Sequence, residues 1–189
     1  LVWPIGSLIH WFCFWLDDIF FPAHKTQPVE KPLFLLGNFR SGSTFLHRLL
    51  PRDSDTSTSL TIWDIFLAPS VTQKKITQFV SRLDNRLGGH LHRLLYAFDR
   101  RTLGKIRIHH ISFFQPEEDE NIQFHLWSSY FISYLFPFMD EMPRYHFFDE
   151  SIPAQEKRHI MAFYKSMLQR HLYATGKKYY AAKAPAFSA

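Results

Sequence analysis

Blocks of apolar residues along the chain predict two short strands and several helices. A continuous apolar run over 33–36 is followed by a turn rich in glycine and hydroxyl residues, and then by apolar residues at helical spacing over 45–50. A second apolar run, over 179–182, ends in Lys183. Runs of this kind are typical of strands buried in a parallel sheet. We therefore expect two neighbouring parallel strands over 33–36 and 179–182, with a helix over 42–50 packed on them.

Three further segments have the pattern of helices. Residues 76–98 carry apolar side chains at helical spacing, although Gly88-Gly89 weakens the middle of this helix. Pro116 and the carboxylates after it are typical of a helix start, and this helix is expected to continue to about residue 134. Pro153 begins another helix, which we expect to end near 174 with Gly176 as its cap.

The N-terminal segment is apolar almost all round over its first 16 residues. This is shorter than the roughly 20 residues that span a bilayer. We expect a helix that packs on the domain, while an interfacial membrane helix and a span that begins before Leu1 stay open as alternatives. A polar connector with three prolines follows over 22–32. We therefore separate an apolar helix and connector, residues 1–27, from a domain over 28–189, and expect any peripheral membrane contact to involve residues 1–21.

Composition narrows the class of protein. The chain has 189 residues, of which 46% are hydrophobic and 21% charged, so it is expected to fold as one globular domain and not to be disordered. A single cysteine excludes a disulfide framework, and the 11 histidines show no metal-ligand spacing, so we expect no metal. The net charge of +5 favours an anionic ligand or an anionic membrane surface. The chain has no initiator Met and stops soon after a predicted strand, so we expect it to be a fragment.

The turn after the first strand, Gly-Asn-Phe-Arg-Ser-Gly-Ser-Thr over 37–44, is the most informative stretch. Between a strand and a helix, the main-chain N–H groups of such a turn point at one anion. The pattern is close to a nucleotide-binding P-loop, but Ser43 stands where the P-loop has its lysine, and Arg40 is the only cation of the turn. The turn is therefore predicted to bind an anion without metal-assisted γ-phosphate chemistry. A helix that is merely capped by Ser41 is the alternative.

Three segments together resemble sulfotransferases that use 3′-phosphoadenosine 5′-phosphosulfate (PAPS). The residues over 32–46 resemble the 5′-phosphosulfate loop of this family, which often reads Arg/Lys-Ser-Gly-Thr-Thr. Pro-Glu-Glu-Asp-Glu over 116–120 resembles the acidic segment of a widespread branch, and Gly-Lys-Lys-Tyr-Tyr-Ala-Ala-Lys-Ala-Pro over 176–185 resembles its strand that ends in Lys-Ser-Pro-x-His. The resemblance covers about 28–189. It implies an α/β fold with a P-loop-like parallel sheet flanked by helices, C-terminally incomplete because the 3′-phosphate-binding part lies beyond the chain.

The resemblance also implies an activity and its residues. The protein would transfer a sulfuryl group from PAPS, its cofactor, to a hydroxyl or amine acceptor, without a metal. The 5′-phosphosulfate would be bound by Arg40, Ser41, Gly42, Ser43 and Thr44. Lys183 would contact the transferring sulfuryl group and the leaving phosphate, although a lysine at a strand end can also be a plain surface residue. The 20 Phe, 8 Tyr and 5 Trp suggest an apolar pocket, and so a small-molecule or lipid hydroxyl acceptor. We expect no nucleic-acid partner and a cytoplasmic, or membrane-associated, location.

One departure from the family pattern concerns the catalytic base. The family has histidine four residues after the strand-end lysine, where this chain has Phe187, which cannot accept a proton. Glu117 or Glu118 is the expected replacement, with His109 and His110 as alternatives. The acidic run could instead be a solvated helix start. Two other functions therefore stay open, a P-loop kinase-like nucleotide-binding module and a sulfotransferase-fold pseudoenzyme.

Overall fold

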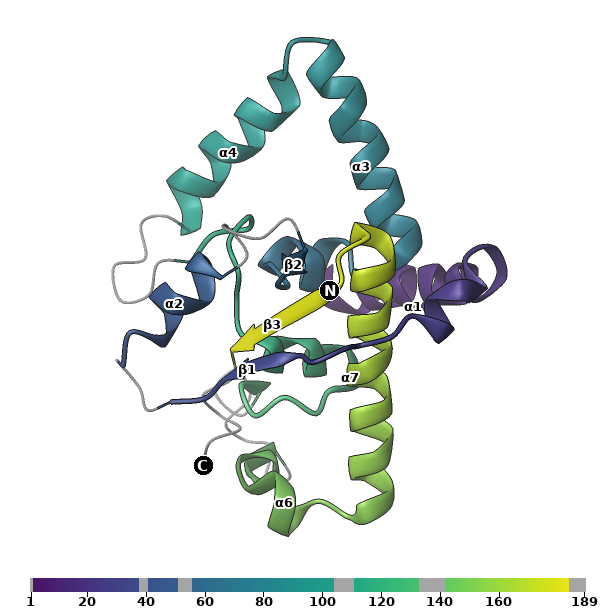
Figure 1. Ribbon diagram of the computed structural model, residues 1–189, viewed down its shortest axis with the longest axis vertical. Coiled ribbons are helices and arrows are strands. Elements are labelled where there is room, and N and C mark those ends of the chain that lie inside the picture. The colour runs from purple at the N-terminus through teal and green to yellow at the C-terminus, as the bar shows by residue number, and fades with distance from the viewer. Residues whose placement is uncertain (1, 38–40, 51–55, 104–110, 133–141, 184–189) are drawn as a thin grey trace.

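The computed structural model describes residues 2–37, 41–50, 56–103, 111–132 and 142–183 (Figure 1). The first half of the chain contains α1 (Val2–Phe20), η1 (Pro22–Thr26), β1 (Leu33–Leu35), α2 (Ser43–Leu49), β2 (Ser57–Thr58), η2 (Trp63–Leu67) and α3 (Val71–Arg86). The second half contains α4 (His90–Thr102), η4 (Asp119–Leu126), η5 (Met142–Phe147), α6 (Phe148–Ser151), α7 (Ala154–Thr175) and β3 (Tyr179–Lys183). The η elements are 3₁₀ helices, except η2, which is a π-helix.

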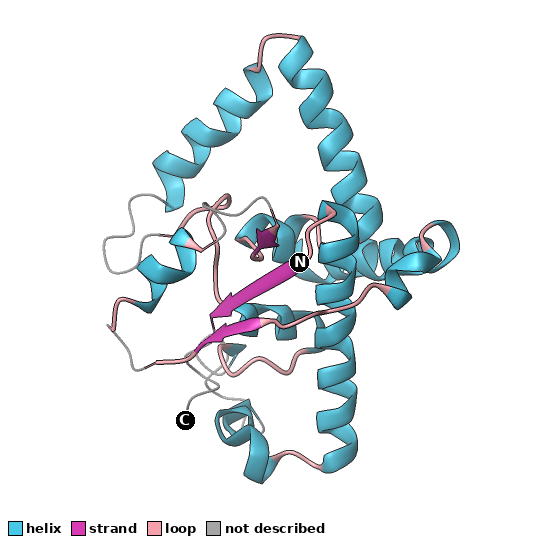
Figure 2. Ribbon diagram, in the orientation of Figure 1, coloured by secondary structure: helices cyan, strands magenta, loops and turns pink. Residues whose placement is uncertain are grey.

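The three strands form one small parallel sheet in the order β1-β3-β2 (Figure 2). β1 and β3 pair with Leu33 beside Ala181 and Leu35 beside Lys183, which confirms the predicted pairing and the α/β fold class. Both α2 and α7 pack against β3, as expected for parallel strands. The expectation that β1 is buried is wrong, because it forms the edge of the sheet and leaves Phe34 43% exposed.

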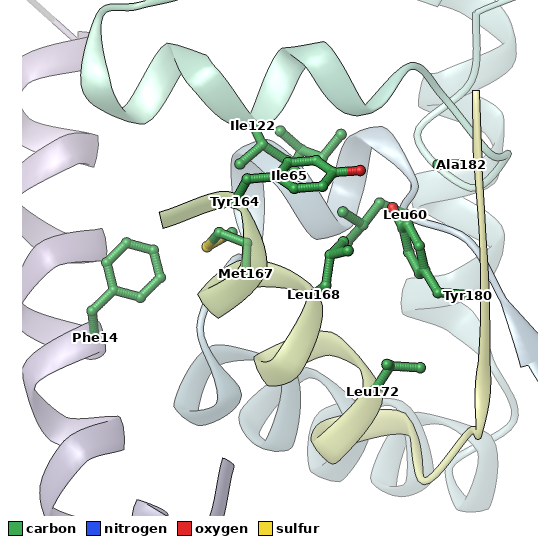
Figure 3. Close-up of a cluster of buried hydrophobic side chains, with 10 residues drawn as sticks. All are labelled: Phe14, Leu60, Ile65, Ile122, Tyr164, Met167, Leu168, Leu172, Tyr180 and Ala182. Atoms are coloured by element: carbon green, nitrogen blue, oxygen red, sulfur yellow. The ribbon is translucent and has the colours of Figure 1, made fainter. Parts of the chain in front are cut away.

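The apolar core lies where α7 meets β3, η4 and the segment around η2 (Figure 3). Side chains of α7 face this core at helical spacing, and the helix begins after Pro153 and ends at Gly176, as predicted. Gly176 has a φ of 68°, a left-handed conformation that glycine adopts without strain. The core residues are Phe14, Leu60, Ile65, Ile122, Tyr164, Met167, Leu168, Leu172, Tyr180 and Ala182.

The single helix expected across Gly88-Gly89 is two helices, α3 and α4, which form an arch in Figure 1. Both glycines have positive φ angles, 97° and 71°, so the backbone reverses direction between the helices. The carboxylate of Asp84 accepts the main-chain N–H groups of Leu91 and His92 at 2.8 and 2.9 Å. It thereby supplies an acceptor for N–H groups in the first turn of α4 and fixes the bend between α3 and α4.

The long helix expected from Pro116 is a short 3₁₀ helix, η4, which ends at Leu126. Trp127 follows with a φ of 55°, in the left-handed region that stops a helix. The acidic residues at the start of η4 are buried, Asp119 fully and Glu120 to within 1%. Their side chains form buried hydrogen bonds and do not lie at a solvated helix start. The sequence pattern therefore predicted neither their burial nor the length of η4.

The N-terminal helix packs on the domain, which confirms the first of the three alternatives. Its inner face buries Phe14 and the carboxylate of Asp17. Asp17 accepts the N–H groups of Val71 and Thr72 at 2.8 and 2.7 Å, and lies 3.1 Å from the guanidinium of Arg170. One buried carboxylate thus joins α1 to the start of α3 and to α7.

The outer face of α1 is also apolar. Leu8, Phe12 and Trp15 are each more than half exposed. Of the helices in the described part of the chain, none combines the length and the hydropathy that crossing a bilayer requires. Peripheral membrane contact through residues 1–21 stays a prediction.

Replacing Asp17 with alanine should destabilise the fold strongly. The change leaves the charge of Arg170 buried without its nearest carboxylate and removes the acceptor of two N–H groups at the start of α3. We expect the free energy of unfolding to fall by about 3–5 kcal/mol, measured by urea denaturation. The neighbouring Asp18, whose side chain is 42% exposed, is the matched control, and Asp18→Ala should cost at most about 1 kcal/mol. Equal losses in the two variants would contradict this account.

Candidate active site

The candidate site lies at the carboxyl ends of β1 and β3. Because the strands are parallel and Leu35 pairs with Lys183, the turn that follows β1 leaves the sheet directly beside Lys183. In open α/β sheets, ligands bind at this edge, outside the carboxyl ends of neighbouring strands. The sheet register therefore brings together two segments that lie about 140 residues apart in the sequence.

The described residues of the turn after β1 have the geometry of a tight strand-to-helix connection. A Cβ atom added to Gly37 would lie 3.1 Å from the hydroxyl of Ser41, so the turn folds back closely on itself. Gly42 precedes α2 with a φ of 80°, and its C=O accepts the N–H groups of Phe45 and Leu46. The residue at the N-cap of α2 is Gly42, which has no side chain, so the alternative of a helix capped by Ser41 is not what the described residues show. The first N–H groups of the helix, at Ser43 and Thr44, have no partner within it.

Lys183 is buried, although lysine is rarely buried without a partner. It is 4% exposed, and its Nζ donates to Glu118 Oε1 at 2.7 Å. The alternative of a surface lysine at a strand end is therefore wrong. The side chain of Glu118 is 15% exposed, so this carboxylate lies on Lys183 at the edge of the buried region.

Glu117 lies next to Glu118 but has a different environment. Its N–H donates to the C=O of Leu60 at 3.0 Å, and its Oε1 accepts the N–H of Glu118 at 3.3 Å. Glu117 is 8% exposed. Of the two carboxylates predicted as bases, the structure places Glu118 on Lys183.

The next two carboxylates of the acidic segment form buried hydrogen bonds, and Asp119 joins the segment to β3 and α7. Asp119 Oδ2 accepts hydrogen bonds from the hydroxyls of Tyr164 at 2.8 Å and Tyr180 at 2.5 Å. Burial raises the pKa of Asp119 to about 7, although these two hydroxyls and the N–H of Lys183 act in the opposite direction. Burial likewise raises the pKa of Glu120 to about 7, against hydrogen bonds from Ser129 and the N–H of Tyr130. The acidic run is therefore a buried polar network and not a solvated helix face.

Two residues near the site were not predicted from the sequence. His47 of α2 is 1% exposed, and its Nε2 lies 3.1 Å from the C=O of Ala181, two residues before Lys183. Ser59 donates to the same carbonyl at 2.7 Å. Burial lowers the pKa of His47, so the neutral ring donates through Nε2. For His47, the sequence showed only a polar residue among the apolar positions of the predicted helix, and this does not specify its partner.

Four of the residues considered from the sequence, Arg40, His109, His110 and Phe187, lie outside the described residues. Within the described ranges, no three His, Cys, Asp or Glu side chains are grouped as metal ligands would be. The described part of the site therefore consists of Gly37 and residues 41–44 of the β1–α2 turn, the Lys183–Glu118 pair and the buried hydrogen bonds of Asp119.

Among solved structures, the chain is similar to the sulfotransferase STF1 of Mycobacterium tuberculosis. The two share 19% sequence identity with a TM-score of 0.61, over 95% of this chain and 46% of that one. The chain thus spans about half the length of that protein. No family model matches the chain, and no curated protein sequence matches it significantly. The similarity shows that this chain has the fold of a sulfotransferase, a mixed α/β fold with a small parallel sheet flanked by helices.

The raised pKa of Asp119 predicts a specific pH dependence of stability. Between about pH 4 and pH 7 the folded state binds more protons than the unfolded state, so this contribution to stability is complete at low pH and is lost as the pH rises through 7. Asp119→Asn should therefore reduce the fall in unfolding free energy between pH 5 and pH 8 by about 2–3 kcal/mol. Urea denaturation at the two pH values measures this. Asp149, with a 97% exposed side chain, is the control, and Asp149→Asn should leave the wild-type slope unchanged.

Proposed function

We propose that the protein transfers a sulfuryl group from PAPS to a hydroxyl or amine acceptor. The observation that carries this proposal is the pairing of Leu35 with Lys183, which sets a buried lysine beside a turn whose sequence resembles a 5′-phosphosulfate loop. The similarity in fold to a sulfotransferase supports it. Sulfuryl transfer, like phosphoryl transfer, depends mainly on positioning and on stabilising charge, and both require groups that converge on one point.

The residues present suit an anionic donor. Ser41, Gly42, Ser43 and Thr44 would bind the 5′-phosphosulfate through main-chain N–H groups and hydroxyls, and Arg40 would add a charged contact. Gly42 has open space on the side where a Cβ would stand, so the backbone is accessible there. Lys183 would approach from the adjacent strand and exchange its contact with Glu118 for one with the donor. Its positive charge would thus stay paired with an anion.

In the proposed reaction, the acceptor oxygen attacks the sulfur atom while the bond between sulfur and the bridging phosphate oxygen breaks. The bond electrons leave with adenosine 3′,5′-bisphosphate, and the ammonium of Lys183 stabilises the charge on that leaving group. Glu118 accepts the proton of the acceptor hydroxyl. The products are a sulfate ester, adenosine 3′,5′-bisphosphate and one proton, so atoms and charge balance.

We assign the base to Glu118 in preference to Glu117. Glu118 Oε1 lies 2.7 Å from Lys183 Nζ. The group that would accept the proton is therefore close to the cation that would stabilise the leaving group. Its partial exposure would also give an acceptor access to it. This position would replace the histidine that the family pattern has where Phe187 stands.

The test is sulfuryl transfer from PAPS to a panel of hydroxyl acceptors by the purified protein. Glu118→Gln should lower kcat by about 10²–10⁴ while the donor, measured by calorimetry, binds at least as tightly as to the wild type, because Lys183 no longer has to leave a carboxylate. Lys183→Met should lower kcat and also weaken binding of adenosine 3′,5′-bisphosphate. Glu30→Gln is the control, because Glu30 is an exposed carboxylate before β1 and should keep full activity.

Three results would count against the proposal. Full activity of Glu118→Gln with loss of activity in Glu117→Gln would move the base to the neighbouring residue. Hydrolysis of ATP with Mg²⁺, without sulfuryl transfer, would favour the kinase-like module. Binding of adenosine 3′,5′-bisphosphate without transfer to any acceptor would favour the pseudoenzyme.

A further inference from the structure

The net positive charge of the chain is concentrated in the arch that α3 and α4 form. Residues 71–102 contain 7 of the 22 Lys and Arg side chains, but only 2 of the 17 Asp and Glu side chains. This stretch therefore has a formal charge of +5, and the rest of the chain is formally neutral. A positive charge that is confined to one pair of helices indicates a surface for an anionic partner.

Most of these cations are available to a partner. Lys74 is the exception, because it is buried at the base of α3 and paired with Asp64. The other six lie at exposed positions, and no carboxylate among the described residues forms an ion pair with them. The two carboxylates of the arch, Asp84 and Asp99, instead accept main-chain N–H groups. The six exposed cations are Lys75, Arg82, Arg86, Arg93, Arg100 and Arg101.

Large apolar side chains are exposed among these cations. Single exposed apolar residues are ordinary on a protein surface, but a group of them marks an interaction site. Four side chains, called here the apolar face of the arch, are each about half exposed or more: Phe79 and Leu83 of α3, and Leu94 and Phe98 of α4. None of the four lines the cavity that lies between the two helices.

Helix geometry places these four side chains on the same side of the arch. Val80 and Leu95 line the cavity, so they mark the side of α3 and of α4 that faces the other helix. On both helices, the members of the apolar face are turned from this inner side by about a quarter turn, in the same rotational sense. The chain reverses direction between the helices, so equal turns bring both pairs to one side (Figure 1).

Arginines border the apolar face. Arg82 and Arg86 each follow one of its members by three residues on α3, and Arg101 follows Phe98 by three residues on α4. Residues at this spacing are neighbours on a helix surface. Apolar side chains with cations beside them are typical of amphipathic helices that lie in the interface of an anionic membrane. Long arginine side chains can reach the phosphates while the apolar groups go deeper.

The arch presents this face on a fixed scaffold. On the lower part of α3, Gln78 donates to the C=O of Ala174 at the end of α7 at 3.0 Å. At the foot of α4, the buried carboxylate of Asp99 accepts the hydroxyl of Ser112 at 2.8 Å. Asp84 fixes the bend at the top, as described above. The helices are therefore already formed and placed, so binding does not include the cost of folding them.

The distribution of charge also argues against other occupants. A second copy that packed on this face through a two-fold interface would bring the arginines of both copies together, and like charges repel. A nucleic acid would pair with the cations but leave the leucines without apolar partners. The outer face of α1 is apolar too, but residues 1–21 contain Asp17 and Asp18 and no Lys or Arg. An anionic membrane therefore suits the arch better than α1.

We infer that the apolar face of the arch binds the surface of an anionic phospholipid membrane. Its leucine and phenylalanine side chains enter the boundary between head groups and acyl chains, and the arginines beside them contact lipid phosphates. The inference rests on the arch alone and does not depend on the proposed function.

The test is sedimentation of the protein with vesicles of phosphatidylcholine, with and without about 30% phosphatidylglycerol. The anionic vesicles should bind at least about tenfold more tightly, and added salt should weaken this binding because it screens exposed charges. Arg82→Gln with Arg86→Gln should lower the affinity about 25-fold, at roughly fivefold for each charge. Arg158→Gln with Lys165→Gln removes two exposed cations of α7 and is the matched control, with an effect of about twofold at most.

A second variant tests the apolar part of the contact. Leu94→Gln keeps the charge and a good helix former, and should lower the affinity for anionic vesicles about tenfold. Met161→Gln is the control, because Met161 is a half-exposed apolar residue of α7, and it should bind as the wild type does. Circular dichroism and thermal melting identify any variant that does not fold.

Binding to anionic vesicles that is weakened in the folded arch variants and kept in both controls supports the inference. Equal binding to neutral and anionic vesicles, or equal losses in arch and control variants, overturns it. Loss of binding in Phe12→Gln with Trp15→Gln, but not in the arch variants, overturns it in favour of α1. Dimerisation that Leu94→Gln abolishes, without vesicle binding, overturns it in favour of a second copy. Binding of heparin without binding of vesicles overturns it in favour of an acidic polymer.

Discussion

The parallel pairing of β1 with β3 is the constraint on which the rest of the structure depends. It brings the residue after Leu35 to the same sheet edge as Lys183, from opposite ends of the sequence. β3 is also the strand to which the surrounding elements attach. β2 pairs with it only as far as Tyr180, and His47 and Ser59 bind the carbonyl of the next residue, Ala181. A shift of one residue in the register would turn the buried side chains of β3 to the opposite faces of the sheet.

Ionisable groups near β3 are buried, and this explains why each of them has a hydrogen-bond or ion-pair partner. An isolated charge is costly in an apolar environment, so each buried group must have a partner or become neutral. Lys183 has Glu118, and Asp119 has two tyrosine hydroxyls and a raised pKa. Groupings of this kind are typical of functional sites, although structural networks also contain them. Here Asp119 and its two tyrosine partners lie next to the Lys183–Glu118 pair and join η4 to β3.

Much of the fold could be predicted from the sequence because its signals are local. The strands β1 and β3 follow from continuous apolar runs, and α7 from a regular periodicity with a proline before it and a glycine after it. Their pairing was expected because continuous apolar strands that alternate with helical segments are typical of one parallel sheet covered by helices. The turn after β1 was recognised from its glycines and hydroxyls between a strand and a helix.

The parts that could not be predicted depend on tertiary contacts. The acidic segment has the composition of a solvated helix start, and nothing local indicates that Asp119 meets Tyr180, 61 residues away. The bend between α3 and α4 depends on Asp84, whose partners lie beyond the two glycines. The exposure of β1 reflects its place at the sheet edge, which an apolar run does not reveal. The sequence therefore indicated candidate residues of the site, but neither their geometry nor the contacts of His47 and Ser59.

The most direct test of the account is a crystal structure of the protein with adenosine 3′,5′-bisphosphate. The account predicts that the 5′-phosphate lies at the turn between β1 and α2, within hydrogen-bond distance of the N–H groups of Ser43 and Thr44, and that Lys183 Nζ has moved from Glu118 to a phosphate oxygen. A nucleotide bound elsewhere on the protein, or a 5′-phosphate at the turn with Lys183 still bound to Glu118 and out of reach, would contradict it.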